Sequence, residues 1–108
     1  MAGTTVSVGV LAVSATIATG LALAGFASAT SVRAAGAADA AALAAADTAS
    51  GLVSGIACER AADIAAEVGA TLGDCQVDGL IATVEVSLAF GPLVASARAR
   101  AGPPPAGP

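Results

Sequence analysis

The two cysteines are the residues of this sequence best placed to do chemistry. Cys58 falls in the first turn of an expected helix and Cys75 on the strand expected after it, so a disulfide would fasten helix to sheet. In the chain-entropy model, closing a loop of this size stabilises a fold by roughly 3 kcal/mol. Two unpaired buried thiols are the alternative, and a redox-active pair would need a C-x-x-C spacing that this chain lacks. We predict the disulfide, and with it a body outside the reducing cytosol.

The other residue types in the sequence predict a protein that is not an enzyme. The chain has no histidine and no lysine, which removes the commonest general base, the usual metal ligand and any Schiff-base nucleophile. Glu59, Asp63 and Glu67 recur at fourfold spacing, but such carboxylates are typical of a solvated helix face. The two cysteines alone cannot form a four-ligand zinc site. We therefore expect no catalytic residues, no metal site and no cofactor.

The composition also argues against nucleic acid as a partner. The formal net charge is −4, and the only aromatic residues are Phe26 and Phe90. The negative charge opposes phosphate binding, and the sequence offers almost no aromatic side chains on which bases could stack.

The opening of the chain predicts a membrane segment. No charged side chain occurs from Ala2 to Val32, and the most aliphatic part runs from Val6 to Phe26. A helix needs about 20 apolar residues to cross a hydrocarbon core of roughly 30 Å, and it satisfies its own backbone hydrogen bonds there. We assign residues 1–32 to a transmembrane segment, with membrane lipid as its partner.

Within this segment, small residues recur at every fourth position, which predicts a ridge where a second helix can approach closely in lipid. The alternative is that an alanine- and glycine-rich composition produces such a ridge by chance. The ridge consists of Ala12, Thr16, Gly20, Ala24 and Ser28.

Two signals give opposite orientations for the segment. The positive-inside rule would place Arg33, the first charged side chain, in the cytoplasm. The cysteines favour an oxidising compartment for everything that follows. We predict a single-pass protein of the cell membrane with an extracytoplasmic C-terminal body.

The remaining segments predict an α+β body. Residues 33–50 are alanine-rich and should continue the membrane helix outward, with Gly36 as a soft point and Gly51 as the break. A second helix is expected over about 55–68, capped by Ser54 and closed by Gly69. Its expected apolar stripe comprises Ile56, Ala57, Ala61, Ile64, Ala65 and Val68.

After this helix the apolar period changes to two, which predicts a small antiparallel β-meander. Asp78-Gly79 is a strong hairpin signal, and Gly91-Pro92 ends the return strand. Residues 51–101 are therefore predicted to form the body, in which the short helix packs on the meander. Residues 102–108 form a proline-rich tail that should be extended or disordered. The return strand is expected to point Ala82, Val84, Val86 and Leu88 inward, and the third strand alternates Ala95, Ala97 and Ala99 with polar residues.

The order of these segments resembles the TadE-like proteins of actinobacterial tight-adherence (Flp-type) pilus systems. The most similar branch is the short one called helicase/secretion neighborhood TadE-like proteins. The resemblance spans nearly the whole chain. It rests on four stretches: GTTVSVGVLAV at the start, RAAGAADAAALAAA at 33–46, ACERAADIAAEVGATLGDCQVDG with its two cysteines, and the closing ARARAGP.

The resemblance implies a minor pilin or pseudopilin with a pilin-like fold, anchored in the membrane and associated with a pilus or secretion machine. Its partners would be other pilin-like or Tad assembly subunits, together with the prepilin peptidase that cuts a short basic leader in the family. This sequence departs from the family pattern in two ways. Its apolar stretch begins within a few residues of Met1, where family members usually carry the basic leader, and nothing acidic precedes Asp39, whereas many pilins have a glutamate early in the helix.

A small secreted envelope protein is the alternative function. Ala27-Ser28-Ala29 is an acceptable A-x-A site for a signal peptidase after an apolar region. Cleavage after Ala29 would make Thr30 the first residue and would remove the anchor.

Overall fold

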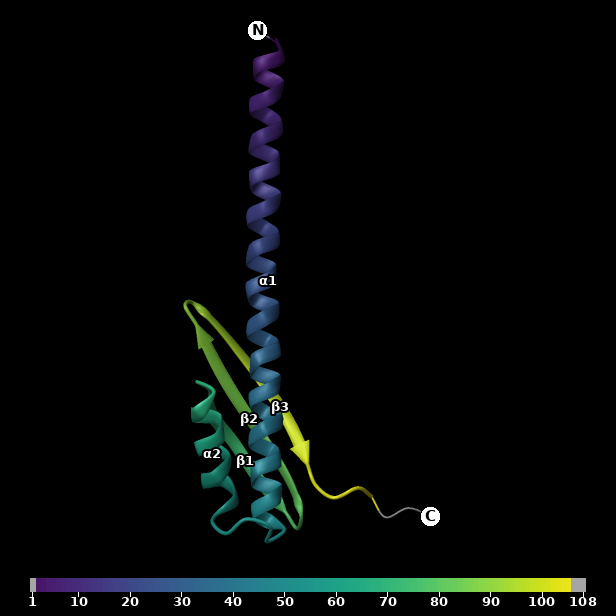
Figure 1. Ribbon diagram of the computed structural model, residues 1–108, viewed down its shortest axis with the longest axis vertical. Helices are drawn as coiled ribbons and strands as arrows, with labels where there is room; N and C mark the ends of the chain where they lie inside the picture. Colours follow the sequence, from purple (N-terminus) through teal and green to yellow (C-terminus); the bar gives the residue numbers. More distant parts are fainter. Residues whose placement is uncertain (1, 106–108) are drawn as a thin grey trace.

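A computed structural model describes residues 2–105 of the chain as a long helix with a small α+β body at one end (Figure 1). The elements follow in the order α1 (Ala2–Ala49), α2 (Ala57–Glu67), β1 (Thr71–Asp78), β2 (Ile81–Phe90) and β3 (Leu93–Ala101). The molecule measures 76 × 35 × 17 Å. The long axis is set by α1, because 48 helical residues extend about 70 Å. The fold class is therefore α+β, as predicted.

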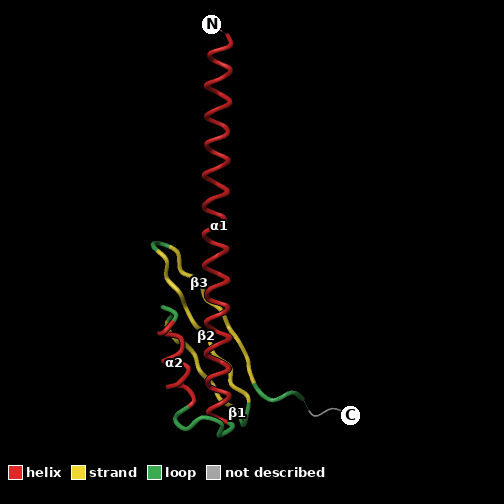
Figure 2. Tube along the Cα trace, viewed as in Figure 1, coloured by secondary structure: helices red, strands yellow, loops and turns green. Residues whose placement is uncertain are grey.

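Helix α1 runs without interruption through both the apolar segment and the alanine-rich extension (Figure 2). Gly36 lies inside it with regular helical structure, so the expected soft point does not break the helix. The helix ends at Ala49, and Gly51 follows with φ of 83°, a left-handed conformation that favours glycine. The expected break at Gly51 is thus confirmed.

Helix α2 begins later than predicted. Its N-cap is Ile56, which makes no side-chain capping hydrogen bond, so the prediction that Ser54 caps the helix is wrong. The reason lies in Gly55, whose φ of 131° is incompatible with a helix and separates Ser54 from the first free N–H groups. At the other end the prediction is confirmed, because Gly69 has a positive φ and donates its N–H to the Ala66 carbonyl. Ala70 N–H bonds to the Ala65 carbonyl, which completes a Schellman motif.

The apolar stripe of α2 is narrower than predicted. Ala61 and Ala65 are fully buried, and Ala57 and Ile64 are partly buried. Ile56 and Val68, which the pattern placed on the same stripe, are exposed. Both lie outside α2, at its N-cap and C-cap, where the 3.6-residue period no longer holds.

The three strands form an antiparallel sheet in the order β1-β2-β3, so the predicted meander is confirmed. Both hairpins use two-residue loops with a positive φ at the first residue only, Gly79 in one and Gly91 in the other. This is the type II′ pattern, in which glycine occupies the first central position. Asp78, predicted as part of the first turn, is instead the last residue of β1.

Strand β1 contains a bulge that the alternating pattern did not predict. Leu72 pairs with Val86 and Cys75 pairs with Val84, so two residues of β1 lie opposite Glu85. The extra residue brings Leu72 and Cys75, three positions apart, to the same face of the sheet, where both pack against the core.

Both helices cover one face of the sheet, with α1 over β2 and β3 and α2 over β1 (Figure 1). The predicted inward residues of β2 are buried, and the alanines of β3 pack against them. The core is built largely from alanine, which lets α1 lie close to the sheet. The contribution of α1 to this core consists of Ala34, Ala37, Ala38, Ala41, Ala42, Ala45 and Ala46.

The tail begins directly after β3. Residues 102–105, the described part of the predicted tail, form no helix or strand. Residues 106–108 of that tail, and Met1 of the predicted membrane segment, lie outside the described residues.

Candidate functional site

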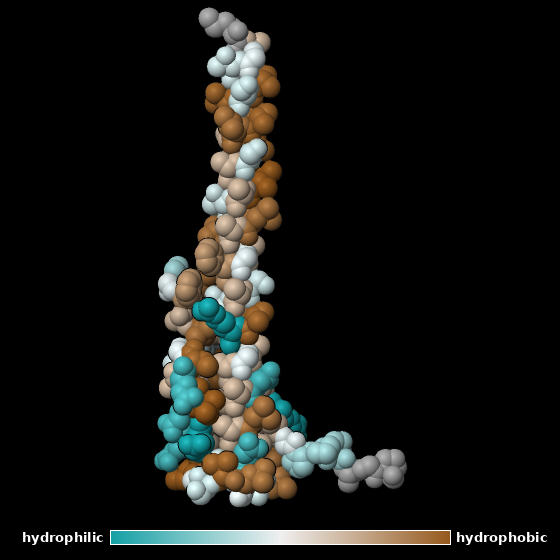
Figure 3. Space-filling model, viewed as in Figure 1, coloured by the Kyte–Doolittle hydropathy of each residue, from teal (hydrophilic) through white to brown (hydrophobic). Residues whose placement is uncertain are grey.

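The largest exposed feature of the molecule is the apolar part of α1. Within residues 2–105, α1 is the one helix long and apolar enough to cross a membrane. Its most apolar 18-residue window has a mean hydropathy of 2.0, and none of that window is buried against the body. Figure 3 shows aliphatic side chains along this half of the molecule and hydrophilic ones gathered on the body. This surface is suited to lipid or to other apolar helices.

The hydroxyl groups in this half of α1 are compatible with lipid because the helix itself satisfies several of them. Ser7 Oγ donates to the Gly3 carbonyl at 2.9 Å, and Thr16 Oγ1 donates to the Ala12 carbonyl at 2.9 Å. Thr19 makes the same bond to Ala15. A hydroxyl paired with the carbonyl four residues before it exposes no unsatisfied donor to hydrocarbon.

The five residues of the predicted ridge are all exposed on α1 and lie on one i, i+4 row. Such rows are inclined to the helix axis by about 26°, so the ridge winds around the helix instead of running straight. Two helices that pack through such rows cross with right-handed geometry, as GxxxG pairs do. A side chain built at Gly20 would meet no atom within 4 Å in this chain. The ridge is therefore free to contact another molecule.

The predicted disulfide joins Cys58 and Cys75. Their Cα atoms are 5.9 Å apart, and the bond links the first turn of α2 to β1 across 17 positions of sequence. Both cysteines are partly buried, and Cys75 packs against the core. The bond closes the α2–β1 unit on itself, on the side of the sheet that α1 covers least.

The structure also brings together the two phenylalanines, which the sequence analysis did not connect. Phe26 of α1 and Phe90 at the end of β2 stack with ring centroids 6.1 Å apart and ring planes inclined by 18°. Offset aromatic pairs of this kind are favourable by about 0.5–1.5 kcal/mol. The only sequence signal was that these are the chain's two aromatic residues. Their contact depends on how far up α1 the hairpin reaches.

A second unpredicted cluster lies on the open face of the sheet. Arg98 Nε donates to Glu85 Oε2 at 2.7 Å, and Arg98 Nη2 lies 3.4 Å from Asp74 Oδ2. The hydrogen bond and charge of Glu85 raise the pKa of the Arg98 guanidinium, with the charge of Asp74 adding to the effect. An arginine guanidinium is charged at every pH that a cell meets, with or without this effect. Counting back from the Gly91-Pro92 loop would have paired Glu85 with Arg98, whereas Asp74 joins them at the bulge.

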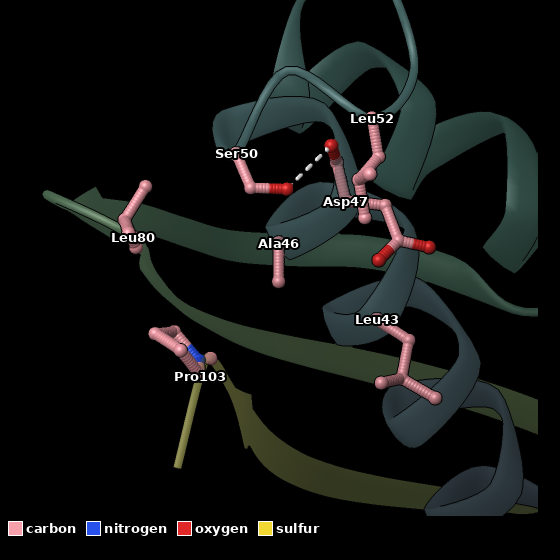
Figure 4. Close-up of a pocket in the computed structure, with 8 residues that line it drawn as sticks. Leu43, Ala46, Asp47, Ser50, Leu52, Leu80 and Pro103 are labelled. Atoms are coloured by element: carbon pink, nitrogen blue, oxygen red, sulfur yellow. Dashed lines mark hydrogen bonds between the residues drawn. The ribbon is translucent and has the colours of Figure 1, made fainter. Parts of the chain in front are cut away.

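One pocket, of about 270 Å³, lies between the end of α1, the loop that follows it, the β1–β2 loop and the start of the tail (Figure 4). It is lined mainly by aliphatic side chains, among them Leu43, Leu52 and Leu80. The hydroxyl group of Ser50 donates to the backbone carbonyl of Asp47 at 3.0 Å. The lining residues thus offer mainly apolar contact.

The acidic residues of α2, Glu59, Asp63 and Glu67, are exposed, as a solvated helix face should be. Among residues 2–105 no group of three or more histidine, cysteine or acidic side chains is arranged to hold a metal ion.

Comparisons with protein-family models, with curated proteins and with solved structures found no match for this chain. The structural features that bear on function are the exposed apolar helix and its unbroken continuation into a small body closed by a disulfide.

Proposed function

We propose that this protein is a membrane-anchored structural subunit that acts through helix packing and has no chemistry of its own. The observation that carries the proposal is the double role of α1 as one unbroken helix, Ala2–Ala49. Its first part is uncharged and exposed, whereas its last part supplies half of the buried core of the body. A body held in this way cannot turn independently of its membrane segment.

More specifically, we propose a minor pilin or pseudopilin of a Tad/Flp-type pilus or secretion system. An apolar helix that continues into an alanine face packed on an antiparallel sheet, with one disulfide in the body, fits a pilin-like subunit. The resemblance to TadE-like proteins in segment order and cysteine placement supports the same class. In this proposal other pilin-like or Tad assembly subunits are the partners, and a prepilin peptidase would act on the chain if a basic leader precedes the apolar stretch.

The disulfide supports an extracytoplasmic body, because such bonds persist in oxidising compartments. The protein would then cross the cell membrane once, with α1 in the bilayer and its C-terminal body outside. The ridge from Ala12 to Ser28 would meet a neighbouring transmembrane helix. The aliphatic end of the body around Leu52 and Leu80 would be a second contact surface for a subunit outside the membrane.

One observation favours the alternative of a secreted envelope protein. Residues 2–29 are all exposed, and the buried part of α1 begins at Thr30. Cleavage after Ala29 would therefore remove the Phe26–Phe90 contact and leave the whole buried core intact.

The test uses the full chain with a C-terminal tag, expressed in its own cell. We expect the tagged protein to stay in the membrane after alkaline extraction, with an N-terminus upstream of Ala29. Protease added to intact spheroplasts should digest the region after Val32, and full protection would mean the opposite orientation. Thr30 as the first residue of a released protein would overturn the anchored subunit in favour of the secreted one.

The class of subunit needs its own measurement, because many proteins are anchored by one helix. Crosslinking in the cell followed by mass spectrometry should recover other chains with an N-terminal apolar helix, or polytopic assembly proteins of a secretion system. Recovery of the monomer alone, at crosslinker doses that capture a known membrane complex, would contradict the pilin-like role.

A further inference from the structure

The loop between β2 and β3 is the part of the body that reaches farthest along the apolar half of α1 (Figure 1). Phe90, the last residue of β2, stacks on Phe26 of α1. Beyond this contact, the first residues of β3 lie beside the same turns of α1, because Leu93 and Val94 share a shallow hollow with Thr30. The tip of this hairpin, residues 90–94, is therefore level with the end of the apolar segment.

This hairpin tip differs in chemistry from the rest of the sheet. No charged residue occurs between Glu85 and Arg98 in the sequence. At the tip, Phe90 is 50% exposed and Val94 is 69% exposed, although both are large apolar side chains. The charged cluster of the sheet, at Glu85 and Arg98, lies farther from the apolar half of α1 than the tip does. Contact of an apolar, uncharged loop with bulk water is unfavourable, whereas contact with lipid at this level is favourable.

The position of the hydrocarbon boundary follows from helix geometry. The aliphatic stretch from Val6 to Phe26 rises about 30 Å, which matches the thickness of the hydrocarbon core. The interfacial layer adds roughly 5–7 Å on each side, about four more residues of helix. It ends close to Arg33, the first charged residue of α1. Phe26 and its partner Phe90 then lie where hydrocarbon meets headgroups.

We propose that the hairpin tip, residues 90–94, inserts into the membrane interface beside α1 and forms a second contact with lipid. The inference rests on the proposed membrane anchor, because the level of the tip is defined by the span of α1. Continuity with that span identifies lipid as the occupant. The uncharged surface of α1 passes into that of the tip through the Phe26–Phe90 contact. Two contacts with the bilayer fix the tilt and rotation of α1, and with them the direction that the ridge faces.

The chain contains no tryptophan and no tyrosine, so a single introduced tryptophan reports its own depth without background. The test places it in turn at Val94 in the tip, at Leu11 in the middle of the span, and at Leu52 at the far end of the body. These three side chains are 69%, 69% and 79% exposed, so each replacement leaves the core untouched. The variants, in the full chain, are Val94→Trp, Leu11→Trp and Leu52→Trp.

Each variant is reconstituted in phosphatidylcholine vesicles that carry a nitroxide quencher either near the headgroup or near the end of the acyl chain. We expect Val94→Trp to lose more fluorescence to the shallow quencher than to the deep one, and to emit at shorter wavelength than Leu52→Trp. Leu11→Trp should respond most to the deep quencher. Far-UV circular dichroism of each variant should match the parent and confirm the fold.

The other outcomes separate the tip from the anchor. If Leu11→Trp is quenched but Val94→Trp behaves like Leu52→Trp, α1 spans the bilayer and the tip contact is wrong. If Val94→Trp is shifted to short wavelength yet escapes both quenchers, a second copy covers the tip and lipid is excluded. If Leu11→Trp is not quenched, the anchor and the tip contact both fail.

Discussion

The disulfide offers the sharpest test of how this small body is held together. We predict that replacing both cysteines, Cys58→Ala with Cys75→Ala, lowers the free energy of unfolding of the body by about 3 kcal/mol. The value follows from the 17 positions between the joined residues, since the chain-entropy relation gives about 3 kcal/mol at 25 °C for a loop of that length. A domain below about 80 residues rarely gains more than about 3–5 kcal/mol from its core. The loss should leave the body barely folded.

The core explains why the effect should be so large. Among the buried side chains of residues 2–105, most are alanines, and only Val84 and Val86 are both large and fully buried. Alanine removes little apolar area from water, so the hydrophobic term per residue is small. The bond also joins α2, which packs on α1, to β1, the strand that α1 contacts least. Without the bond we expect β1 to separate first.

The assay is urea unfolding of the full chain in detergent micelles, followed by far-UV circular dichroism because the chain lacks tryptophan and tyrosine. With a slope of about 1–3 kcal/mol per molar urea, the midpoint should fall by roughly 1–3 M. The parent protein treated with a reductant should show the same fall. If only the double variant is weakened, the loss comes from packing at the two alanines, and loop closure is refuted. An unchanged midpoint would refute the stapling argument altogether.

Four further substitutions test the ridge, the core and the backbone. Gly20→Leu should abolish crosslinking to a neighbouring helix with membrane insertion unchanged, because leucine would hold the partner away from the ridge. Val86→Ala should lower the free energy of unfolding by about 2 kcal/mol in the urea assay, through lost burial and a cavity. Gly36→Ala should raise it by about 0.5–1 kcal/mol, since Gly36 is helical and has open space for a Cβ. Gly79→Ala should lower it by about 1 kcal/mol, because Gly79 has φ of +61°.

The ridge and backbone predictions have matched variants, and each prediction has a result that would contradict it. Gly25→Leu adds the same side chain on nearly the opposite side of α1, where a Cβ also meets no atom within 4 Å. Equal crosslinking by Gly20→Leu, Gly25→Leu and the parent would mean that the ridge is a by-product of composition. A loss below about 0.5 kcal/mol at Val86 would show that the sheet collapses around the gap. Gly36→Ala and Gly79→Ala should change the free energy of unfolding in opposite directions. Equal changes would contradict the explanation from backbone conformation.

The sheet could be predicted from the sequence because its signals are local. The alternation of Ala82, Val84 and Val86 with polar residues defines a buried face, and the glycine loops define the register. The start of α2 was wrong because Ser54 carries the right side chain for a cap, whereas the φ of Gly55 prevents the helix from reaching it. Residue type suggests a cap, but backbone conformation decides it.

Contacts between segments that are distant in sequence could not be predicted from local sequence patterns. The stacking of Phe26 on Phe90 depends on how far α1 slides along the sheet, and an alanine face sets that position only weakly. Asp74 reaches Arg98 only through the bulge in β1, whose extra residue has no signature in the alternating pattern. The disulfide was predictable because the helix and strand that carry its cysteines are adjacent in sequence.

The alanine content of α1 links the anchor to the body in a way that neither half explains alone. Small side chains from Ala34 to Ala46 let the helix lie close to β2 and β3, and no break separates them from the exposed half. A helix that is continuous at Gly36 transmits rotation of the body to the ridge around Gly20. Any contact that fixes the body, at the hairpin tip or at its far end, therefore also fixes the direction in which α1 meets a partner helix.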